Sequence, residues 1–296
     1  MKIGIIHFRS TLSESVVDLL RAATEENVEA EYVRVQGLDS YIVDGKISVK
    51  YHNRELDISG AVLRGVGMFM SLEVFMKRIG VLEALSKTVP VVNDPVASVI
   101  ARDKWRSLLA LASAGLPVPN TLVTENPFTA MRYVEQARRA VLKPITGSLG
   151  LGSTLVEDPD VAFQLTKGLS SMGIPSYYQV FLDKPGFDFR LFVVGGRVVA
   201  GMKRVVEGKW KTNVAQGARG VKVDESEYPE AFKLALEATK VLKLDYAGVD
   251  IALDRATNKL FILEVNAFPQ WHGLKLATGV DPSRDIIRLL KDKIKK

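Results

Sequence analysis

The stretch AGVDIALDRATNKLFILEVN, residues 247–266, decides how the rest of this chain is interpreted. Apolar residues dominate both halves, and the polar segment 254–258 between them predicts a turn that folds two strands antiparallel. Glu264 and Asn266 are two residues apart in the second strand, so their side chains share one face. The first strand carries Asp250, and the turn brings it back toward Glu264.

We expect Asp250 to lie opposite Glu264, which requires Leu253 to lie near Phe261. Together with Asn266, three oxygen-bearing side chains then converge, and the two carboxylates repel each other unless a cation lies between them. Such hard oxygen ligands suit Mg²⁺, which keeps substrate phosphates and water as its other ligands. The alternative is a polar face on a surface hairpin. Apolar neighbours favour the metal site, because one face should pack on a core: Val249, Ile251, Leu263 and Val265.

Alternating strands and helices predict an α/β protein in three parts. The first part, residues 1–95, should be a small parallel sheet covered by helices. The second part, residues 96–183, should open with one long helix from Pro95 to Ala114 and contain the Gly-rich loop 147–152. The third part, residues 184–296, should hold the predicted metal strands and a final helix.

Composition excludes several classes of protein. The 296 residues include no cysteine, which rules out disulfides, cysteine zinc sites and cysteine nucleophiles. The three histidines have no metal-ligand spacing, so we do not expect a zinc enzyme. No signal-peptide core and no apolar run of about 18 residues is found, which predicts a cytoplasmic protein without membrane contact. The net charge of +6 is spread along the chain, so nucleic-acid binding is not expected.

Lys143 and the loop GSLGLG, residues 147–152, are candidates for binding phosphate. Glycines let the backbone approach phosphate oxygens closely, and their N–H groups can surround them. The loop lacks the Gly-Lys-Ser/Thr ending of a Walker A motif and would be a plain turn if it stood alone. A strand lysine four residues before its first glycine strengthens the phosphate interpretation. Lys104, on a predicted helix, would be an ordinary solvated lysine when taken alone.

Asp188 and Arg190 alternate on one predicted strand, and Arg204 lies on its hairpin partner. Two arginines near a Mg²⁺–phosphate site could bind a carboxylate or stabilise a developing anion. A structural ion pair between Arg190 and Asp188 explains the same pattern equally well, and both interpretations stay open.

Taken together, these residues resemble the ATP-grasp superfamily and, within it, the RimK-like glutamate ligases. The resemblance covers nearly the whole chain, and the order and spacing of its motifs are specific. It implies an ATP-grasp fold, in which a pre-ATP-grasp domain precedes two α+β subdomains that hold ATP between them. The matching stretches are Ala101–Lys104, Val141–Pro144, Asp188–Arg190, Trp210–Gly217, Ala247–Ile251 and Leu263–Pro269.

The resemblance also implies roles for individual residues. Gln179, Val180 and Phe181 match a segment that lines the adenine pocket. Asp250, Glu264 and Asn266 match ligands of Mg²⁺, with Mn²⁺ as an alternative metal. Arg190 and Arg204 are the catalytic candidates for binding the acyl phosphate or the amino acid. The residues implied to bind the nucleotide are Lys104, Lys143, Gly147, Ser148, Gly150, Gln179, Val180, Phe181, Asp188, Lys211, Thr212 and Asn213.

The implied chemistry joins a carboxylate to an amine through an acyl phosphate, with ATP as the phosphate donor. Segments 210–217 and 269–274 look most like ligases that add L-glutamate to tetrahydromethanopterin, a small-molecule acceptor. Ligases that modify a ribosomal protein, and amino-group-carrier ligases of lysine and arginine biosynthesis, are the alternatives. The amine could also come from another amino acid, and enzymes of this kind are often homo-oligomers.

Two other classes of protein are less consistent with the sequence. A nucleotide sensor on the same fold would be expected to lack a metal ligand, yet all three are present. A dinucleotide-binding dehydrogenase would carry a glycine fingerprint after its first strand, but that strand is followed by Ile6-His7-Phe8-Arg9-Ser10.

Overall fold

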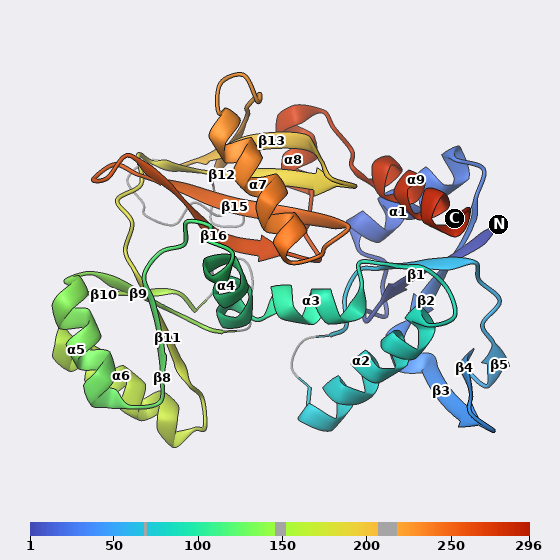
Figure 1. Ribbon diagram of the computed structural model, residues 1–296, viewed down its shortest axis with the longest axis horizontal. Helices are drawn as coiled ribbons and strands as arrows, with labels where there is room; N and C mark the ends of the chain where they lie inside the picture. Colours follow the sequence, from blue (N-terminus) through green and yellow to red (C-terminus); the bar gives the residue numbers. More distant parts are fainter. Residues whose placement is uncertain (68–69, 146–151, 207–217) are drawn as a thin grey trace.

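The computed structural model describes residues 1–67, 70–145, 152–206 and 218–296, whose strands form four sheets (Figure 1). Helices lie between and around these sheets, which confirms the predicted α/β class. Within the described residues, none of the helices combines the length and the apolar character needed to cross a membrane.

The N-terminal sheet is parallel throughout, as the sequence predicts. Its strands, in spatial order, are β2 (Glu29–Arg34), β1 (Lys2–His7), β6 (Gly60–Leu63) and β7 (Val91–Val92). Alternate residues of β1 face opposite sides of the sheet. Ile3 and Ile5 pack toward α1 (Glu14–Glu25) and α9 (Ser283–Ile294), whereas Ile6 packs in the core that α2 (Leu72–Ser86) covers. The C-terminal helix α9 therefore belongs to the packing of the N-terminal sheet.

A small antiparallel sheet follows β2 and the short 3-10 helix η1 (Val35–Gly37), and the sequence interpretation missed it. It consists of β3 (Leu38–Val43), β4 (Lys46–Tyr51) and β5 (Arg54–Glu55). The turn between β3 and β4 is Asp44-Gly45, with φ of 49° and 74°. Asp-Gly with both residues left-handed is a strong signal for a two-residue hairpin, so the sequence did contain the information.

The predicted long helix 95–114 is wrong, because the chain breaks into two helices at Asp103. Helix α3 covers Pro95–Arg102 and α4 covers Lys104–Ser113. The Asp103 backbone is extended, and its carboxylate accepts hydrogen bonds from the N–H groups of Trp105 and Arg106. Aspartate is among the preferred residues for this capping position. The break makes Lys104 the first residue of a helix that lies between two sheets (Figure 1).

The central sheet is packed by its two helices on a single face. Its antiparallel strands, in order, are β10 (Thr154–Val156), β9 (Ala140–Lys143), β11 (Ser176–Val180) and β8 (Thr121–Thr124). Helices α5 (Pro127–Ala137) and α6 (Pro159–Ser171) pack on the face that carries Leu142 and Tyr178. Lys143 and Gln179 alternate with those residues and so lie on the other face.

The C-terminal sheet is antiparallel, and we call it sheet D. Its strands, in order, are β14 (Arg219–Lys222), β13 (Arg197–Val205), β12 (Phe187–Val194), β15 (Tyr246–Asp254) and β16 (Lys259–Asn266). Helix α7 (Pro229–Val241) packs on one face with Val249, Ile251 and Val265, which are fully buried. The predicted core beside the metal strands is therefore confirmed for these three residues, but Leu263 is only half-buried and Ile262 takes its place in the core.

The predicted pairing of Asp250 with Glu264 is confirmed, but the expected pairing of Leu253 is wrong. Leu253 pairs with Leu260, because the register shifts between Asp250 and Ile251. The shift leaves Leu263 as an extra residue in β16. A bulge of this kind keeps the polar residues aligned at one end while the rest of the hairpin pairs in the neighbouring register.

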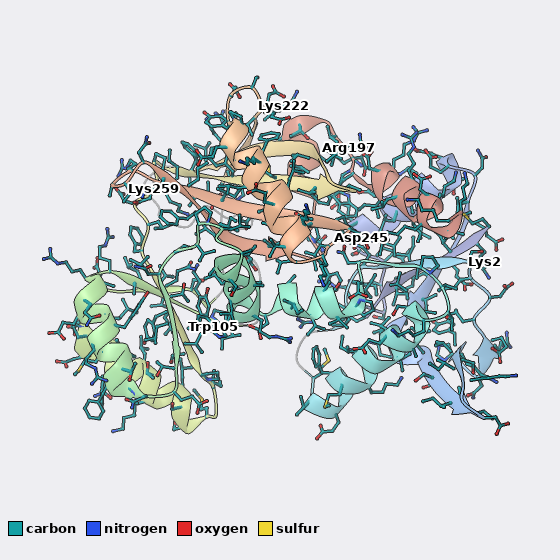
Figure 2. All side chains as sticks on the ribbon, viewed as in Figure 1. Lys2, Trp105, Arg197, Lys222, Asp245 and Lys259 are labelled. Carbon is teal, nitrogen blue, oxygen red and sulfur yellow. The ribbon has the colours of Figure 1, made fainter. Side chains whose placement is uncertain are left out.

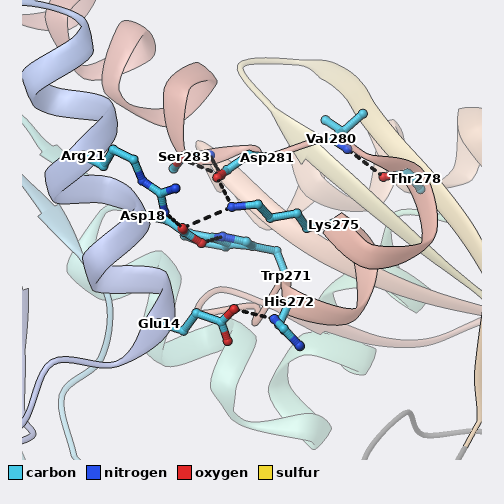
Figure 3. Close-up of polar contacts among 10 residues, drawn as sticks. All are labelled: Glu14, Asp18, Arg21, Trp271, His272, Lys275, Thr278, Val280, Asp281 and Ser283. Carbon is cyan, nitrogen blue, oxygen red and sulfur yellow. Dashed lines mark hydrogen bonds and ion pairs between the residues drawn. The ribbon is translucent and has the colours of Figure 1, made fainter.

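A buried polar contact joins the N-terminal part to the C-terminal helices (Figure 3). Asp18 on α1 is 3% exposed and accepts hydrogen bonds from Trp271 Nε1 (2.9 Å) and Lys275 Nζ (3.2 Å). Lys275 belongs to α8 (His272–Thr278), and at the start of that helix His272 contacts Glu14. Apolar residues of β1, α1, β12 and α9 form one core around this contact, so the two parts fold against each other.

We predict that Asp18→Ala lowers the free energy of unfolding by about 3 kcal/mol, because it leaves the buried Trp271 N–H without an acceptor. Urea unfolding followed by circular dichroism measures this. Arg21 also pairs with Asp18, but its side chain is 54% exposed, so Arg21→Ala should cost less than about 1 kcal/mol. Equal losses in the two variants would contradict this assignment.

Candidate active site

A row of charged side chains crosses sheet D on the face opposite α7. Arg190 on β12 pairs with Asp250 on β15, which pairs with Glu264 on β16. Asp188 lies two residues before Arg190 and pairs with Arg204 on β13. Because facing residues of paired strands project to the same side, all five groups belong to one polar face.

Two arginines are bound to the carboxylates of this face. Arg204 Nε lies 2.7 Å from Asp188 Oδ1, and its Nη2 lies 3.2 Å from Asp250 Oδ2. Arg190 Nε lies 2.9 Å from Asp250 Oδ1. The structural alternative was an ion pair between Arg190 and Asp188. Arg204 is the arginine that pairs with Asp188 instead, while Arg190 reaches the predicted metal ligand.

Arg190 also touches Asn266. With the amide oriented to satisfy both of its ends, Asn266 accepts from Arg190 Nη1 at 3.0 Å and donates to Glu264 Oε1 at 3.2 Å. Asp250, Glu264 and Asn266 are therefore linked into one group, as the strand spacing predicts. A single guanidinium bridges two members of that group.

Gly248 makes room for this arrangement, and sequence reasoning did not single it out. It lies two residues before Asp250 and pairs with Asn266. A Cβ at this position would lie 2.6 Å from Arg190 Nη1 and 2.8 Å from Pro269 Cβ. The absence of a side chain at this position leaves the Arg190 guanidinium room to reach Asn266.

Three lysines approach the polar face. Lys104 Nζ lies 3.5 Å from Glu264 Oε1, and Lys143 Nζ donates to Gln179 Oε1 at 2.5 Å. Lys184, which the sequence interpretation missed, lies 3.6 Å from Asp188 Oδ2. Among the described residues, these lysines and the two arginines place five cationic groups around three carboxylates. The surplus of two positive charges favours a polyanionic ligand such as a nucleotide triphosphate.

Burial and charge change the proton affinities of the site. Burial lowers the pKa of Lys143 to about 8, and the nearby Lys104 and Lys184 ammonium groups add to this effect. Burial raises the pKa of Asp250 against the opposing influence of its two arginines. Burial alone would lower the pKa of Arg204, but Asp250 and Asp188 raise it above its usual value.

The residues of this face fit a divalent cation. Asp250 is 4% exposed, and its Oδ1 has no hydrogen-bond partner among the described residues, although Arg190 lies close to it. Asp250 Oδ1 keeps its ion pair with Arg190 Nε at 2.9 Å, but no hydrogen-bond donor among the described residues uses its lone pairs, so they are open to a metal. Among the described residues, no group of three or more His, Cys, Asp or Glu side chains is placed to hold a metal ion by itself, so the amide of Asn266 completes the donor set here. Two carboxylates and one amide suit Mg²⁺, which takes its other ligands from substrate phosphates and water.

The remaining predicted nucleotide residues divide into two groups. Gln179 is buried beside Lys143 on the face of the central sheet opposite α5 and α6, and Val180 ends the same strand. Phe181 follows it and lies under the Arg139 guanidinium, 4.0 Å from the ring centre. The other group lies outside the described residues: Gly147, Ser148, Gly150, Lys211, Thr212 and Asn213.

The fold and the polar face define an ATP-grasp protein. The family of the RimK-like ATP-grasp domain matches residues 101–290, about two thirds of the chain, and the chain belongs to that family. A probable alpha-L-glutamate ligase of Haemophilus influenzae is 35% identical over 66% of this chain and 64% of its own length. The tetrahydromethanopterin:alpha-L-glutamate ligase of Methanococcus maripaludis is 31% identical over 97% of both chains.

A solved structure supports the fold independently. The ATP-grasp ligase PsnB, complexed with a minimal precursor, Mg and ADP, superimposes with a TM-score of 0.75 at 22% identity. The similarity covers 99% of this chain and 98% of PsnB. At this level of identity it establishes the ATP-grasp architecture of the whole chain, including the N-terminal part that lies before residue 101.

We predict that Gly248→Ala weakens Mg²⁺-dependent ATP binding about 10- to 100-fold, because the new methyl group displaces the Arg190 guanidinium from Asp250 and Asn266. Calorimetric titration with ATP at several Mg²⁺ concentrations measures the loss. Gly168→Ala on α6 is the matched control, since a Cβ there meets nothing within 4 Å. Unchanged binding in Gly248→Ala would show that the position of Arg190 does not matter.

We also predict that ATP affinity falls as pH rises above 8, because Lys143, whose pKa is about 8, loses the charge that attracts phosphate. One proton gives a limiting slope of about tenfold per pH unit. Fluorescence titration with a nucleotide analogue between pH 7 and 9.5 measures it. The Lys143→Met variant should bind the nucleotide analogue more weakly, and its affinity should no longer fall as pH rises. The Lys167→Met variant, changed on α6, should keep the pH dependence of the wild type. A slope that survives in Lys143→Met would assign the titration to another group.

Proposed function

We propose that the protein is an ATP- and Mg²⁺-dependent ligase that joins L-glutamate to a small-molecule carboxylate acceptor such as tetrahydromethanopterin. The observation that supports this most is the polar face of sheet D. Asp250, Glu264 and Asn266 converge there, and Lys104 and Lys143 approach from the central part of the chain. The surplus of positive charge and the donor set match Mg²⁺ and triphosphate together.

The proposed reaction has two steps. A carboxylate oxygen of the acceptor attacks the γ-phosphorus of ATP, the bond to the ADP oxygen breaks, and an acyl phosphate forms. The glutamate amine then attacks the acyl carbon, the bond to the phosphate oxygen breaks, and the amine loses a proton as the amide forms. Both steps need positioning and charge neutralisation more than a covalent nucleophile.

The side chains of this face can supply those needs. Lys104 and Lys143 are the proposed phosphate contacts, while Asp250, Glu264 and Asn266 would hold Mg²⁺ or, alternatively, Mn²⁺. The metal, when bound, neutralises charge on the transferring phosphate. Arg190 and Arg204 remain the proposed groups that stabilise the acyl phosphate, and their ion pairs fix their direction. Further proposed nucleotide contacts are Gly147, Ser148, Gly150, Gln179, Val180, Phe181, Asp188, Lys211, Thr212 and Asn213.

The nature of the acceptor rests on the relatives. Identity along nearly the whole chain with the Methanococcus enzyme favours a small-molecule acceptor. A peptide acceptor is the second candidate, because the superimposable PsnB structure holds a minimal precursor. Ribosomal-protein and amino-group-carrier acceptors belong to this second class.

The test is ADP release with ATP, Mg²⁺ and L-glutamate, measured against tetrahydromethanopterin and against a glutamate-ended peptide. We expect turnover with the pterin, and at least about a 100-fold loss in Asp250→Asn, which keeps shape but loses the negative charge. Asp224→Asn, at an exposed position after β14, is the matched control. Turnover with the peptide alone would move the acceptor to the second class. No Mg²⁺-dependent ATP binding at all would overturn the proposed function.

A further inference from the structure

Asn93, in the N-terminal part, has its side chain buried inside the C-terminal sheet. It follows β7 directly and is 0% exposed. Its Oδ1 accepts hydrogen bonds from the backbone N–H groups of Asp245 (2.7 Å) and Tyr246 (2.9 Å). Its Nδ2 donates to the carbonyl oxygens of Tyr246 (2.9 Å) and Ala267 (2.8 Å). The amide therefore uses both lone pairs and both hydrogens, its full capacity.

The partners of Asn93 flank the strands that carry the predicted metal ligands. Tyr246 is the first residue of β15, and Ala267 directly follows Asn266 at the end of β16. The ladder between these strands has its last pair at Gly248 and Asn266. Beyond that pair the Asn93 amide binds both strands, as a peptide group of an additional strand would. Figure 2 labels Asp245 at the end of sheet D nearest the N-terminal sheet.

A second buried group of the N-terminal part binds the same segment. Arg64 is 2% exposed, and its Nη2 donates to the carbonyl oxygen of Pro269 at 2.8 Å. Its Nη1 donates to the Tyr246 hydroxyl at 3.3 Å, and its guanidinium stacks on Trp271 at 4.4 Å from the ring centre. The chain just after Asn266 is thus fixed at two points, Ala267 and Pro269.

We propose that Asn93 is a positioning residue for the metal site, one that holds Asn266 at its distance from Asp250. This inference rests on the proposed function, because it assumes that Asp250, Glu264 and Asn266 bind Mg²⁺. Without the Asn93 amide, the carbonyl groups of Tyr246 and Ala267 lose buried donors, and the end of β16 is free to move away from β15. Replacing a residue that orients a metal ligand, without itself binding the metal, typically weakens metal affinity about 10- to 100-fold.

The test compares the Mg²⁺ dependence of ADP binding in the full-length wild type and in Asn93→Ala, by calorimetry at increasing Mg²⁺. We expect half-saturating Mg²⁺ to rise at least about tenfold in the variant, with ADP binding restored at high Mg²⁺. Asn126→Ala is the matched control. Asn126 caps α5 through the N–H groups of Phe128 and Thr129, far from sheet D, so this variant should melt earlier but keep the wild-type Mg²⁺ dependence.

The outcomes separate the inference from the proposed function. If ADP binding by the wild-type protein does not depend on Mg²⁺, the proposed function itself is overturned. Normal Mg²⁺ dependence in wild type and in Asn93→Ala would overturn only the role of Asn93. If Asn93→Ala does not fold, Asn93→Ser, whose hydroxyl replaces one donor and one acceptor, gives the same comparison. Failure of both variants to fold would assign Asn93 to the fold rather than to the metal site, and would also overturn the inference.

Discussion

Asp250 is a carboxylate that folding removes from water and places between two guanidinium groups. Burying an unpaired carboxylate costs several kcal/mol, so its position is tolerable only because Arg190 and Arg204 lie within ion-pair distance. The arginines are buried in turn, and Arg204 requires Asp188 as a second anion. Each buried charge in this series therefore requires a buried partner of opposite charge. The network extends across β13, β12, β15 and β16 and reaches α4 through Lys104 and Glu264.

A network of this kind makes the site rigid before any ligand arrives. Its side chains cannot adopt other rotamers without leaving a buried charge unpaired, so their geometry is fixed in advance. Preorganised charge of this sort contributes most to phosphoryl transfer, where the protein supplies position and neutralisation. The arrangement also explains why Gly248 lacks a side chain: the network needs the space above β15 for the Arg190 guanidinium.

The sequence predicted those parts of the site that depend on strand alternation. Asp250, Glu264 and Asn266 share a face because residues two apart in a strand do so, and no distant contact alters that rule. The bulge at Leu263 escaped prediction, since it depends on how β16 pairs with β15 beyond the ligands. The helix break at Asp103 had a local signal, a good capping residue, but the prediction of one helix from Pro95 to Ala114 did not use it. The contacts of Asn93 join residues about 150 or more positions apart, and no local pattern encodes them.

The N-terminal part packs against the rest of the molecule, although it lies outside the region that the family shares. Its apolar residues share a core with β12 and α9, so its position relative to the polar face of sheet D is fixed by packing. It lies outside the matched family region, which begins at residue 101, yet the Methanococcus relative resembles this chain over 97% of its length. Residues 101–290 carry the nucleotide chemistry that the family shares. The first hundred residues therefore act on the site through the shared core and through the hydrogen bonds of Asn93 and Arg64 to the end of β16, which fix the chain directly after Asn266.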